Sequence, residues 1–360
     1  MLFVLFSSCA SEDIFPSIGT NLSNPVSIAI DSAANRAYLV NSNSKVFYET
    51  GSLQILDIST PAAPVLLNTV EMPNFSGQAY LSGGYLYLTN RLSSNNSDTS
   101  DSLLRINIDE ASASFLTIDA YAASSNPFGI AYDAVSANLY VATLGDQLDY
   151  YPIASPSRSS VALAPLNLSD GTAVTDVDIR EVVIIGRQAF ATRPRDGLLV
   201  IDLDENNVDY YISDIFSPRG IATDGVNLFV ASVDTSTTAL TNHLYVINPA
   251  SLTALAGNAT ATRIDKDDSG LVVADVSVGT DLQEVAVSTN YIFVSNMGAD
   301  SVSVINRADY SKGSDITVGD EPFGMNVYPA GAETHLYVTN IQSNSVSIID
   351  LATLAVAATY

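Results

Sequence analysis

The sequence predicts an all-β fold, a seven-bladed β-propeller whose four-stranded antiparallel blades surround a central channel. Three observations support this prediction. A module of roughly 50 residues recurs seven times along the chain. Each copy holds short runs rich in β-branched and aromatic residues, and hardly any segment has helical periodicity. Because one such unit cannot bury both faces of its sheet, neighbouring sheets must stack in a ring.

The second strand of each predicted blade is its most regular element. The copies read RAYLVN, YLYLTN, NLYVAT, QAFATR, NLFVAS, YIFVSN and HLYVTN, and they begin at Arg36, Tyr85, Asn138, Gln188, Asn227, Tyr291 and His335. The third strands follow as SLQILD, SLLRIN, QLDYYP, GLLVID, HLYVIN, SVSVIN and SVSIID. In residues 301–306 the Val and Ile positions alternate with polar ones, so they can face adjoining sheets.

The remaining strands are less regular. An inner strand begins near a Pro-x-Gly motif such as Pro322 to Gly324, and an outer strand is expected at positions such as 64–72 and 315–319. Insertions at 41–52, 91–102 and 249–281 are expected to be solvated loops. Either 355–360 or 14–20 can complete the seventh blade, and the C-terminal segment is the preferred closing strand.

The repeat LYVTN followed by SVSIID resembles the YVTN family of β-propeller proteins, found in bacterial envelopes and archaeal surface layers. The resemblance covers nearly all of residues 25–360 and is highest in blades six and seven. Other propeller types fit poorly, since the chain lacks tryptophan. The resemblance implies a non-catalytic binding protein outside the cytoplasm, with residues 21–360 forming a single propeller domain.

The charge of the chain limits its partners. Thirty-nine acidic residues against 14 basic ones give a formal net charge of −25, so phosphate backbones and anionic lipid surfaces are repelled. We therefore expect no nucleic acid partner. The acidic excess serves solubility or the binding of cations or basic proteins.

Cys9 is the single cysteine, which excludes an internal disulfide and a cysteine-based zinc cluster. It follows MLFVLFSS, which resembles the end of a bacterial lipoprotein signal. Residues 1–9 are predicted to be a truncated signal with Cys9 as the lipidation site, and 10–20 a tether or closing strand. The alternative is a hydrophobic N-terminus with an incidental cysteine. No later segment has the roughly 20 apolar residues of a membrane span, so membrane contact is expected only through the lipid anchor, at the cell envelope as a periplasmic or outer-membrane protein.

Alignment of the inner strands predicts one level of residues facing the channel. This level contains Ser27, Gln78, Gly129, Glu181, Gly220, Glu284 and Gly324. Glu181 and Glu284 replace the glycine that the repeat prefers. One hypothesis is that they bind Ca²⁺ together with Gln78, since Ca²⁺ prefers oxygen ligands. The alternative is an internal salt bridge with Arg180 and Arg219, because buried charges are usually paired.

A second departure from the repeat is Arg193, which stands where the other six blades have Asn, Thr or Ser. Arg195 follows two residues later, and Arg91 lies beside Asn90. With Arg180, Arg187 and Arg219, these arginines are predicted to form a patch that binds a carboxylate or another anionic group. The alternative is a set of arginines spread around an acidic rim.

A third candidate is DKDDSG, in which Asp265, Asp267 and Ser269 match the opening of an oxygen-lined calcium loop. Val276 stands where an EF-hand carries its bidentate glutamate, so a simple acidic turn is the alternative.

These features favour a non-catalytic extracytoplasmic lipoprotein, a monomer that binds a protein or cell-surface ligand. We expect no cofactor, and Ca²⁺ is the one ion that the candidate sites suggest. The alternative function is a lactonase-like hydrolase, in which Glu181 or Glu284 holds a divalent metal that activates water in the channel. A structural surface component is a third hypothesis. The two histidines precede LYV runs on different strand types, so nothing places them beside a nucleophile.

Overall fold

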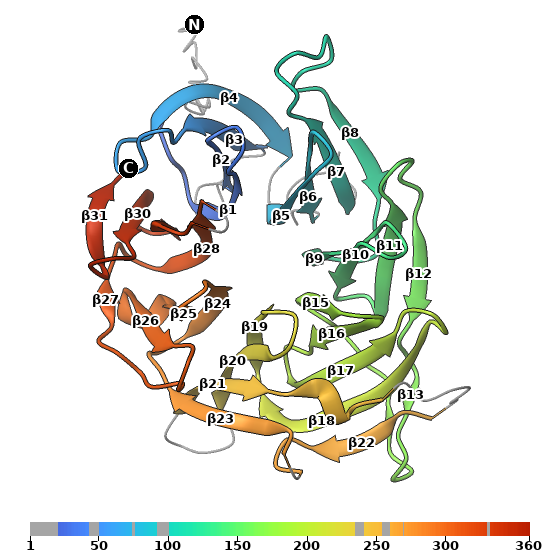
Figure 1. The fold of residues 1–360 in the computed structure, drawn as a ribbon. Coiled ribbons are helices and arrows are strands. Elements are labelled where there is room, and N and C mark those ends of the chain that lie inside the picture. Colours follow the sequence, from blue (N-terminus) through green and yellow to red (C-terminus); the bar gives the residue numbers. More distant parts are fainter. Residues whose placement is uncertain are drawn as a thin grey trace, which may run out of the picture.

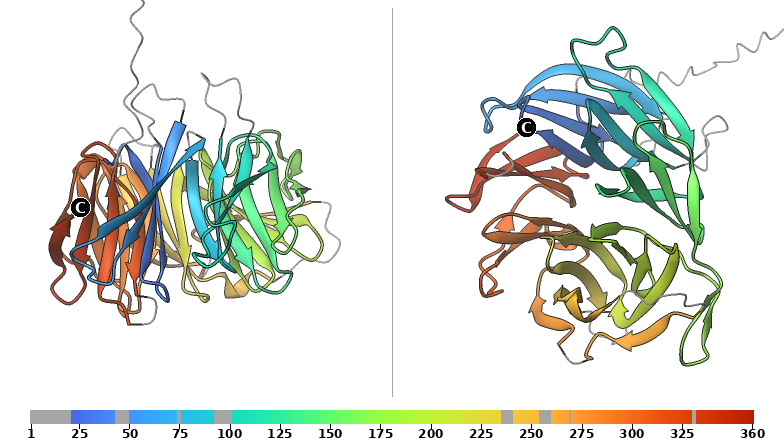
Figure 2. Two further views of the ribbon diagram at one scale, coloured as in Figure 1. Left: turned by 90° about the horizontal axis from the view of Figure 1, so that it is seen from above. Right: turned by 45° about the vertical axis from the view of Figure 1, so that its right-hand side comes forward.

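The computed structural model is a closed ring of seven antiparallel blades (Figure 1), which confirms the predicted fold class. The structure describes residues 21–42, 50–73, 76–91, 101–234, 241–253, 260–268, 270–329 and 332–360. In the side view of Figure 2 the strands run along the axis of the ring, so the turns gather on two opposite faces. We call the face that carries the turns between second and third strands the upper face.

The first three blades follow the chain order. They are β1(Pro25–Asp31), β2(Arg36–Asn41), β3(Thr50–Asp57) and β4(Val65–Pro73); then β5(Ser76–Ser82), β6(Tyr85–Asn90), β7(Ser102–Asn107) and β8(Ile118–Ala122); then β9(Pro127–Asp133), β10(Asn138–Thr143), β11(Gln147–Pro152) and β12(Ser159–Ala162). A small hairpin, β13(Leu166–Asn167) and β14(Ala173–Val174), separates blade 3 from blade 4 in the chain.

The remaining four blades complete the ring. They are β15(Val182–Ile185), β16(Gln188–Thr192), β17(Asp196–Asp202) and β18(Asn207–Phe216); β19(Pro218–Thr223), β20(Leu228–Asp234), β21(Thr241–Ile247) and β23(Val272–Ser277); β24(Leu282–Val287), β25(Tyr291–Asn296), β26(Ser301–Asn306) and β27(Ile316–Thr317); and β28(Pro322–Tyr328), β29(His335–Asn340), β30(Ser345–Asp350) and β31(Ala355–Thr359).

Alternation along the second and third strands sends successive side chains to opposite neighbouring blades. In β29, Leu336 and Val338 pack against Phe293 and its neighbours in blade 6. Tyr337, between them, packs against Leu39 in blade 1. Both faces of each blade are therefore buried between adjacent sheets, which explains why these strands are the most apolar in the repeat.

The last two residues of the YVTN-like strand have separate structural roles. In blade 7, Thr339 Oγ1 accepts the backbone N–H of Gly324 at 2.8 Å, which holds a β-bulge in the inner strand. The Asn340 amide donates to the hydroxyls of Ser345 and Ser347, both at 3.0 Å, which ties the second strand to the third. The Ser and Asn residues of the repeat therefore fix the upper corner of the blade.

The segment from 249 to 281 differs from the predicted solvated loop. It contains β23, the outer strand of blade 5, and β22(Thr262–Asp265), which pairs in parallel with β18 as a fifth strand on blade 4. The insertion thus covers the outer edge of blade 4, an edge that would otherwise present unpaired backbone groups.

The C-terminal strand β31 pairs with β30 and completes blade 7. Residues 1–20 lie outside the described part of the chain, so the signal segment, the lipidation of Cys9 and the role of 10–20 stay predictions. Among the described residues, no helix is long and apolar enough to cross a membrane.

Candidate functional site

A β-bulge near the start of the inner strands supplies the side chains of the channel. In blade 6, Gln283 and Glu284 together oppose Ser295, whose hydroxyl accepts the Glu284 N–H at 2.9 Å. In blade 4, the Thr192 hydroxyl accepts the Glu181 N–H at 3.1 Å in the same way. Two consecutive residues therefore reach the channel region from one strand, which an ideal alternating strand would not allow.

The glycines at the predicted channel level lie where neighbouring inner strands touch. The Gly129 N–H donates to the Arg180 carbonyl at 2.8 Å, and a Cβ on Gly129 would lie 2.6 Å from Glu181 Cα. Gly220 faces Gln283 and Glu284 of the next blade at similarly short range. Glycine is preferred at this level because backbone approaches backbone.

The side chains of Gln78 and Glu181 each contact the backbone of the next inner strand, as the glycines do through their own backbone. Gln78 Oε1 accepts the N–H of Ile130 at 3.1 Å, and Glu181 Oε2 accepts the N–H of Ile221 at 3.0 Å. Each acceptor thus joins its blade to the inner strand of the next blade. The structure places Glu181 between blades 4 and 5, where it is 2% exposed.

Side chains from non-adjacent blades cross the channel. Gln78 Nε2 of blade 2 donates to Glu284 Oε1 of blade 6 at 2.9 Å. Arg180 of blade 4 donates from Nη2 to Gln283 Oε1 of blade 6 at 3.1 Å. The rings of Phe128 and Phe323, from blades 3 and 7, meet edge to face with centroids 6.4 Å apart. We call these six residues the channel plug.

Arg180 is the cation shared by the two glutamates. Its Nε lies 4.0 Å from Glu181 Oε1, and its guanidinium lies 4.8 Å from the centre of the Phe128 ring. Burial raises the pKa of Glu181 well above its usual range, with the Glu284 charge adding to the effect and Arg180 opposing it. Burial also raises the pKa of Glu284, opposed by Gln78 and Arg180. One arginine therefore faces two buried carboxyl groups, and its single positive charge balances the charge of only one of them.

A cavity of about 110 Å³ adjoins the plug on the side of the upper face. We call it the mouth pocket. Its lining residues are Val26, Ser42, Ser76, Gly77, Gln78, Arg91, Phe128, Glu284, Phe323 and Ile341. Ser42, Arg91 and Ile341 directly follow second strands, which places this opening among the upper turns. The pocket thus combines one carboxyl group, one guanidinium group and two aromatic rings.

The predicted arginine patch is divided between two places. Arg193 is 5% exposed in its side chain and pairs with Asp196 at 3.0 Å, donates to the Asp176 carbonyl at 2.9 Å, and lies 5.3 Å over the Tyr211 ring. Arg195 is 70% exposed in its side chain and pairs with the Asp176 carboxylate. Arg193 and Arg195 therefore lie at the upper corner of blade 4, whereas Arg180 belongs to the channel plug.

Arg91 and Arg219 have different surroundings. Arg91 lines the mouth pocket and lies near Asp101, whose charge opposes the lowering of the Arg91 pKa by burial. The charge of Arg219 acts on Arg180, and its carbonyl accepts a hydrogen bond from Thr192 Oγ1 at 3.3 Å. The Arg219 guanidinium makes no hydrogen bond or ion pair with the part of the chain that the structure describes.

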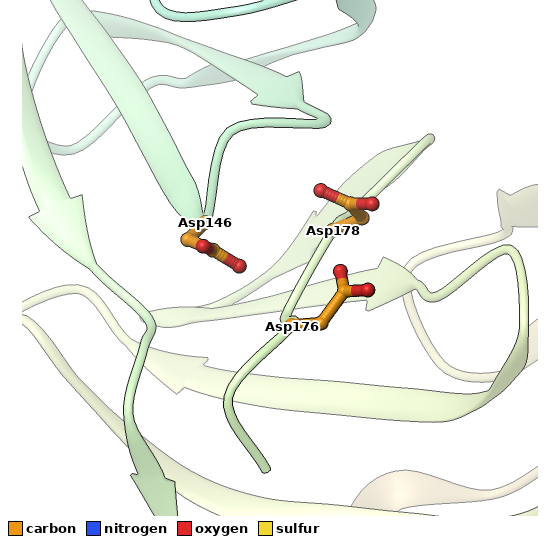
Figure 3. A group of neighbouring side chains, drawn as sticks. All are labelled: Asp146, Asp176 and Asp178. Atoms are coloured by element: carbon orange, nitrogen blue, oxygen red, sulfur yellow. The ribbon is translucent and has the colours of Figure 1, made fainter.

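An acidic cluster at the junction of blades 3 and 4 was not predicted from the sequence. Asp146 lies in the turn after β10, and Asp176 and Asp178 lie in the segment before β15 (Figure 3). Among the described residues, this is the one group of three possible metal ligands whose oxygens lie within 4.8 Å of one another. Burial, followed by the nearby Asp176 and Asp146 carboxylates, raises the pKa of Asp178 to about 6.

The repeat gives only a weak signal for this cluster. Asp176 lies five residues before Glu181, and Gly279 and Gly319 lie five residues before Glu284 and Gly324. The other four blades carry Leu22, Pro73, Ser124 and Ile215 at this position, so the repeat as a whole does not mark the aspartate as a departure.

The predicted calcium loop forms a turn between β22 and β23. Asp265 Oδ1 accepts the N–H of Asp267 at 2.9 Å, and this contact lowers the pKa of Asp265. Lys266 Nζ lies 2.7 Å from Asp267 Oδ1. Ser269 lies outside the described residues. These contacts are those of an acidic turn, and metal binding at Asp265, Asp267 and Ser269 stays a prediction.

No protein-family model matches the chain, and no curated protein matches it. Solved structures resemble it in fold. Hydrazine synthase from Kuenenia stuttgartiensis has a TM-score of 0.68 at 16% identity, over 93% of this chain and 98% of that one. The Cps50 (Swd1) β-propeller domain of Myceliophteria thermophila has a TM-score of 0.66 at 13% identity, over 92% and 100%. The computationally designed Ika8 protein has a TM-score of 0.59 at 8% identity, over 94% and 87%. At these identities the likeness establishes the β-propeller fold alone.

Proposed function

We propose that this chain is a non-catalytic binding module of the cell envelope, anchored through a lipid on Cys9, which engages a protein or cell-surface ligand at the mouth pocket. The observation that carries this proposal is the channel plug. It closes the ring centre with hydrogen-bonded and packed side chains and leaves a small pocket on the upper face. Propeller folds commonly mediate protein interactions, and their function lies in such sites.

The contacts of the glutamates argue against the alternative hydrolase. A catalytic metal needs ionised carboxylates and an open coordination position. Glu181 already accepts a backbone N–H, Glu284 already accepts from Gln78, and both lie beside Arg180. A metal ion would have to displace the arginine or bind next to its positive charge.

Binding can be tested by soaking crystals of the protein with a fragment library that contains cations, anions and neutral compounds. We expect fragments to occupy the mouth pocket. Fragments found at other sites, with none at the mouth pocket, would overturn the proposed binding face. The variant Val26→Phe should remove this density, because Val26 lines the pocket and is only partly buried, so a larger side chain there takes up the pocket volume.

Catalysis and anchoring need separate measurements. Hydrolysis of lactones should stay at background with and without Ca²⁺ or Zn²⁺, and metal-dependent turnover that Glu284→Gln abolishes would favour the hydrolase. Replacement of Cys9 by Ser in the full-length protein should move it from the membrane fraction to the soluble fraction. An unchanged distribution would refute the anchor.

Calcium binding by Glu181, Glu284 and Gln78 stays a prediction. Addition of CaCl₂ should raise the unfolding temperature if the ion binds the native state, and Glu284→Gln should remove that rise if the channel holds it. A rise that Asp265→Asn removes instead would assign the ion to the turn between β22 and β23.

A further inference from the structure

We propose that the mouth pocket binds the ammonium group of a lysine side chain presented by a basic protein partner. This inference rests on the proposed function, because it specifies what the mouth pocket takes from the ligand. Its evidence is the size of the cavity, the chemistry of the residues that line it, and the charge of the whole chain.

The size of the mouth pocket fits one side chain better than a cofactor. Its volume is about 110 Å³. Pockets for drug-sized molecules and cofactors usually measure roughly 300–1,000 Å³. An apolar protein cavity of roughly 150 Å³ accommodates benzene. The pocket therefore suits the end of a single side chain, which a protein partner inserts as an anchor of its interface.

Glu284 supplies the acceptor for the ammonium group. Its Oε1 accepts from Gln78, whereas Oε2 has no hydrogen bond with the described part of the chain. An ammonium group carries three donors and no acceptor, so it can bond to this second oxygen. Because burial disfavours the charge of Glu284, a cation beside it stabilises the ionised form.

The remaining walls suit the rest of a lysine side chain. Phe128 and Phe323 line the pocket with aromatic rings, and because Arg180 already lies over both of them, their contribution is apolar contact. Val26 and Ile341 are also lining residues and offer apolar contact to a methylene stem. The pocket thus pairs an acidic end with apolar sides.

An anionic group is the competing occupant, because Arg91 lines the pocket and Arg180 lies nearby. Both arginines already have contacts within the protein. Arg180 donates to Gln283 and lies over Phe128, and Arg91 lies near Asp101. The net charge of −25 also attracts basic partners to the protein as a whole and repels acidic ones. These observations favour the cation.

The test uses three amino acids as probes, each blocked at its backbone groups only. They are Nα-acetyl-lysine methylamide, with a free side-chain ammonium group, and its norleucine and glutamate counterparts. Norleucine keeps the apolar stem of lysine without the ammonium group. Dissociation constants are measured by NMR titration of the intact protein. We expect the lysine probe to bind at the mouth pocket at least about tenfold tighter than norleucine, since a charge-assisted hydrogen bond contributes this order of affinity.

Two charge-neutralising variants complete the experiment. Glu284→Gln should weaken the lysine probe about tenfold. Glu71 is an exposed glutamate on β4. Glu71→Gln makes the same change in net charge and should leave binding of the lysine probe unchanged. The probe comparison on the unaltered protein keeps the test valid even if Glu284→Gln unfolds.

Each outcome has a defined meaning. Equal binding of lysine and norleucine, or tighter binding of glutamate, overturns the ammonium site. If none of the probes binds while library fragments still occupy the mouth pocket, this inference fails and the proposed binding face stands. If fragments are also absent from the pocket, both fail.

Discussion

In blade 6, Asn296 ends the second strand, and its amide donates to the hydroxyls of Ser301 and Ser303 at 3.1 and 3.0 Å. The chain that leads into the blade passes directly over this amide at Gly279, where a Cβ would lie 2.6 Å from Asn296 Nδ2. Blade 7 repeats the arrangement with Asn340 and Gly319. Blades 6 and 7 thus build the upper corner from neutral groups.

Blade 4 builds the corresponding corner from charged groups. Arg193 replaces the asparagine and pairs with Asp196, and Asp176 replaces the glycine and offers its carbonyl to Arg193. Asp176 also brings its carboxylate next to Asp146 and Asp178. The difference teaches that the two departures from the repeat belong together, since the longer arginine needs the acceptor that the aspartate segment provides.

Among the predicted variants, replacement of Arg193 should cause the largest loss of stability at this corner. Arg193→Ala removes a buried cation and leaves the Asp176 carbonyl without its donor, so we expect a loss of about 3 kcal/mol in the free energy of unfolding. Urea denaturation measures it. Arg195→Ala is the matched control, because its exposed pair with Asp176 should contribute less than about 0.5 kcal/mol. Similar losses in both variants would show that burial of Arg193 has no special importance.

Replacement of Gly279, in the neutral corner of blade 6, should cause the next largest loss in the free energy of unfolding. Gly279→Ala places a methyl group against the fully buried Asn296, and we expect a loss of about 2 kcal/mol from overpacking. Gly313→Ala is the control, because the nearest atom to its Cβ would be the Val304 carbonyl oxygen at an ordinary 3.5 Å. Equal stability of the two variants would refute the close approach.

Conversion of blade 4 to the regular pattern tests whether its two departures depend on each other. Arg193→Asn, Asp176→Gly and the double variant form a thermodynamic cycle. We expect the double variant to be more stable than the sum of the single losses, by about 1 kcal/mol, because Arg193→Asn takes a cation from beside the acidic cluster and Asp176→Gly removes one charge of that cluster. Additive losses would mean that the two positions act independently.

The acidic cluster makes the stability of blade 4 depend on pH, with the smallest expected effect. The pKa of Asp178 is about 6 in the folded protein and roughly 3.9 in an unfolded chain. Between these values the native state binds more protons, so this group lowers stability as pH rises through 6. Asp178→Asn should therefore increase stability at pH 7.5 by less than about 1 kcal/mol, since the group is partly exposed, and change little at pH 4.5. Urea denaturation at both pH values measures this, and parallel pH profiles of the variant and the original protein would contradict it.

The repeat made most of the fold predictable. Alternating side chains such as Leu336 and Tyr337 must face different neighbours in any stacked ring, so strands and ring order follow from the pattern. The pairing of β22 with β18 did not follow, because a parallel strand at an outer edge leaves no periodic signal in its own sequence.

The site was predictable in composition and only partly in geometry. The repeat marks Glu181, Glu284, Arg193 and Arg219 as departures. It did not show that Glu181 turns towards Ile221 while Glu284 reaches across to Gln78. Both residues stand at the same position of the repeat, so the direction of each side chain depends on which neighbour the closed ring provides.

The contacts across the channel also bear on how the molecule unfolds. In an open array of repeats, each unit touches only its neighbours, and local opening can spread from one unit to the next. Here the Gln78–Glu284 bond joins positions 206 residues apart, and Arg180 and Gln283 are joined over 103 residues. Loss of one blade would expose partners on the far side of the ring. The seven blades are therefore expected to exchange their amide hydrogens as one cooperative unit rather than in sequence from an end.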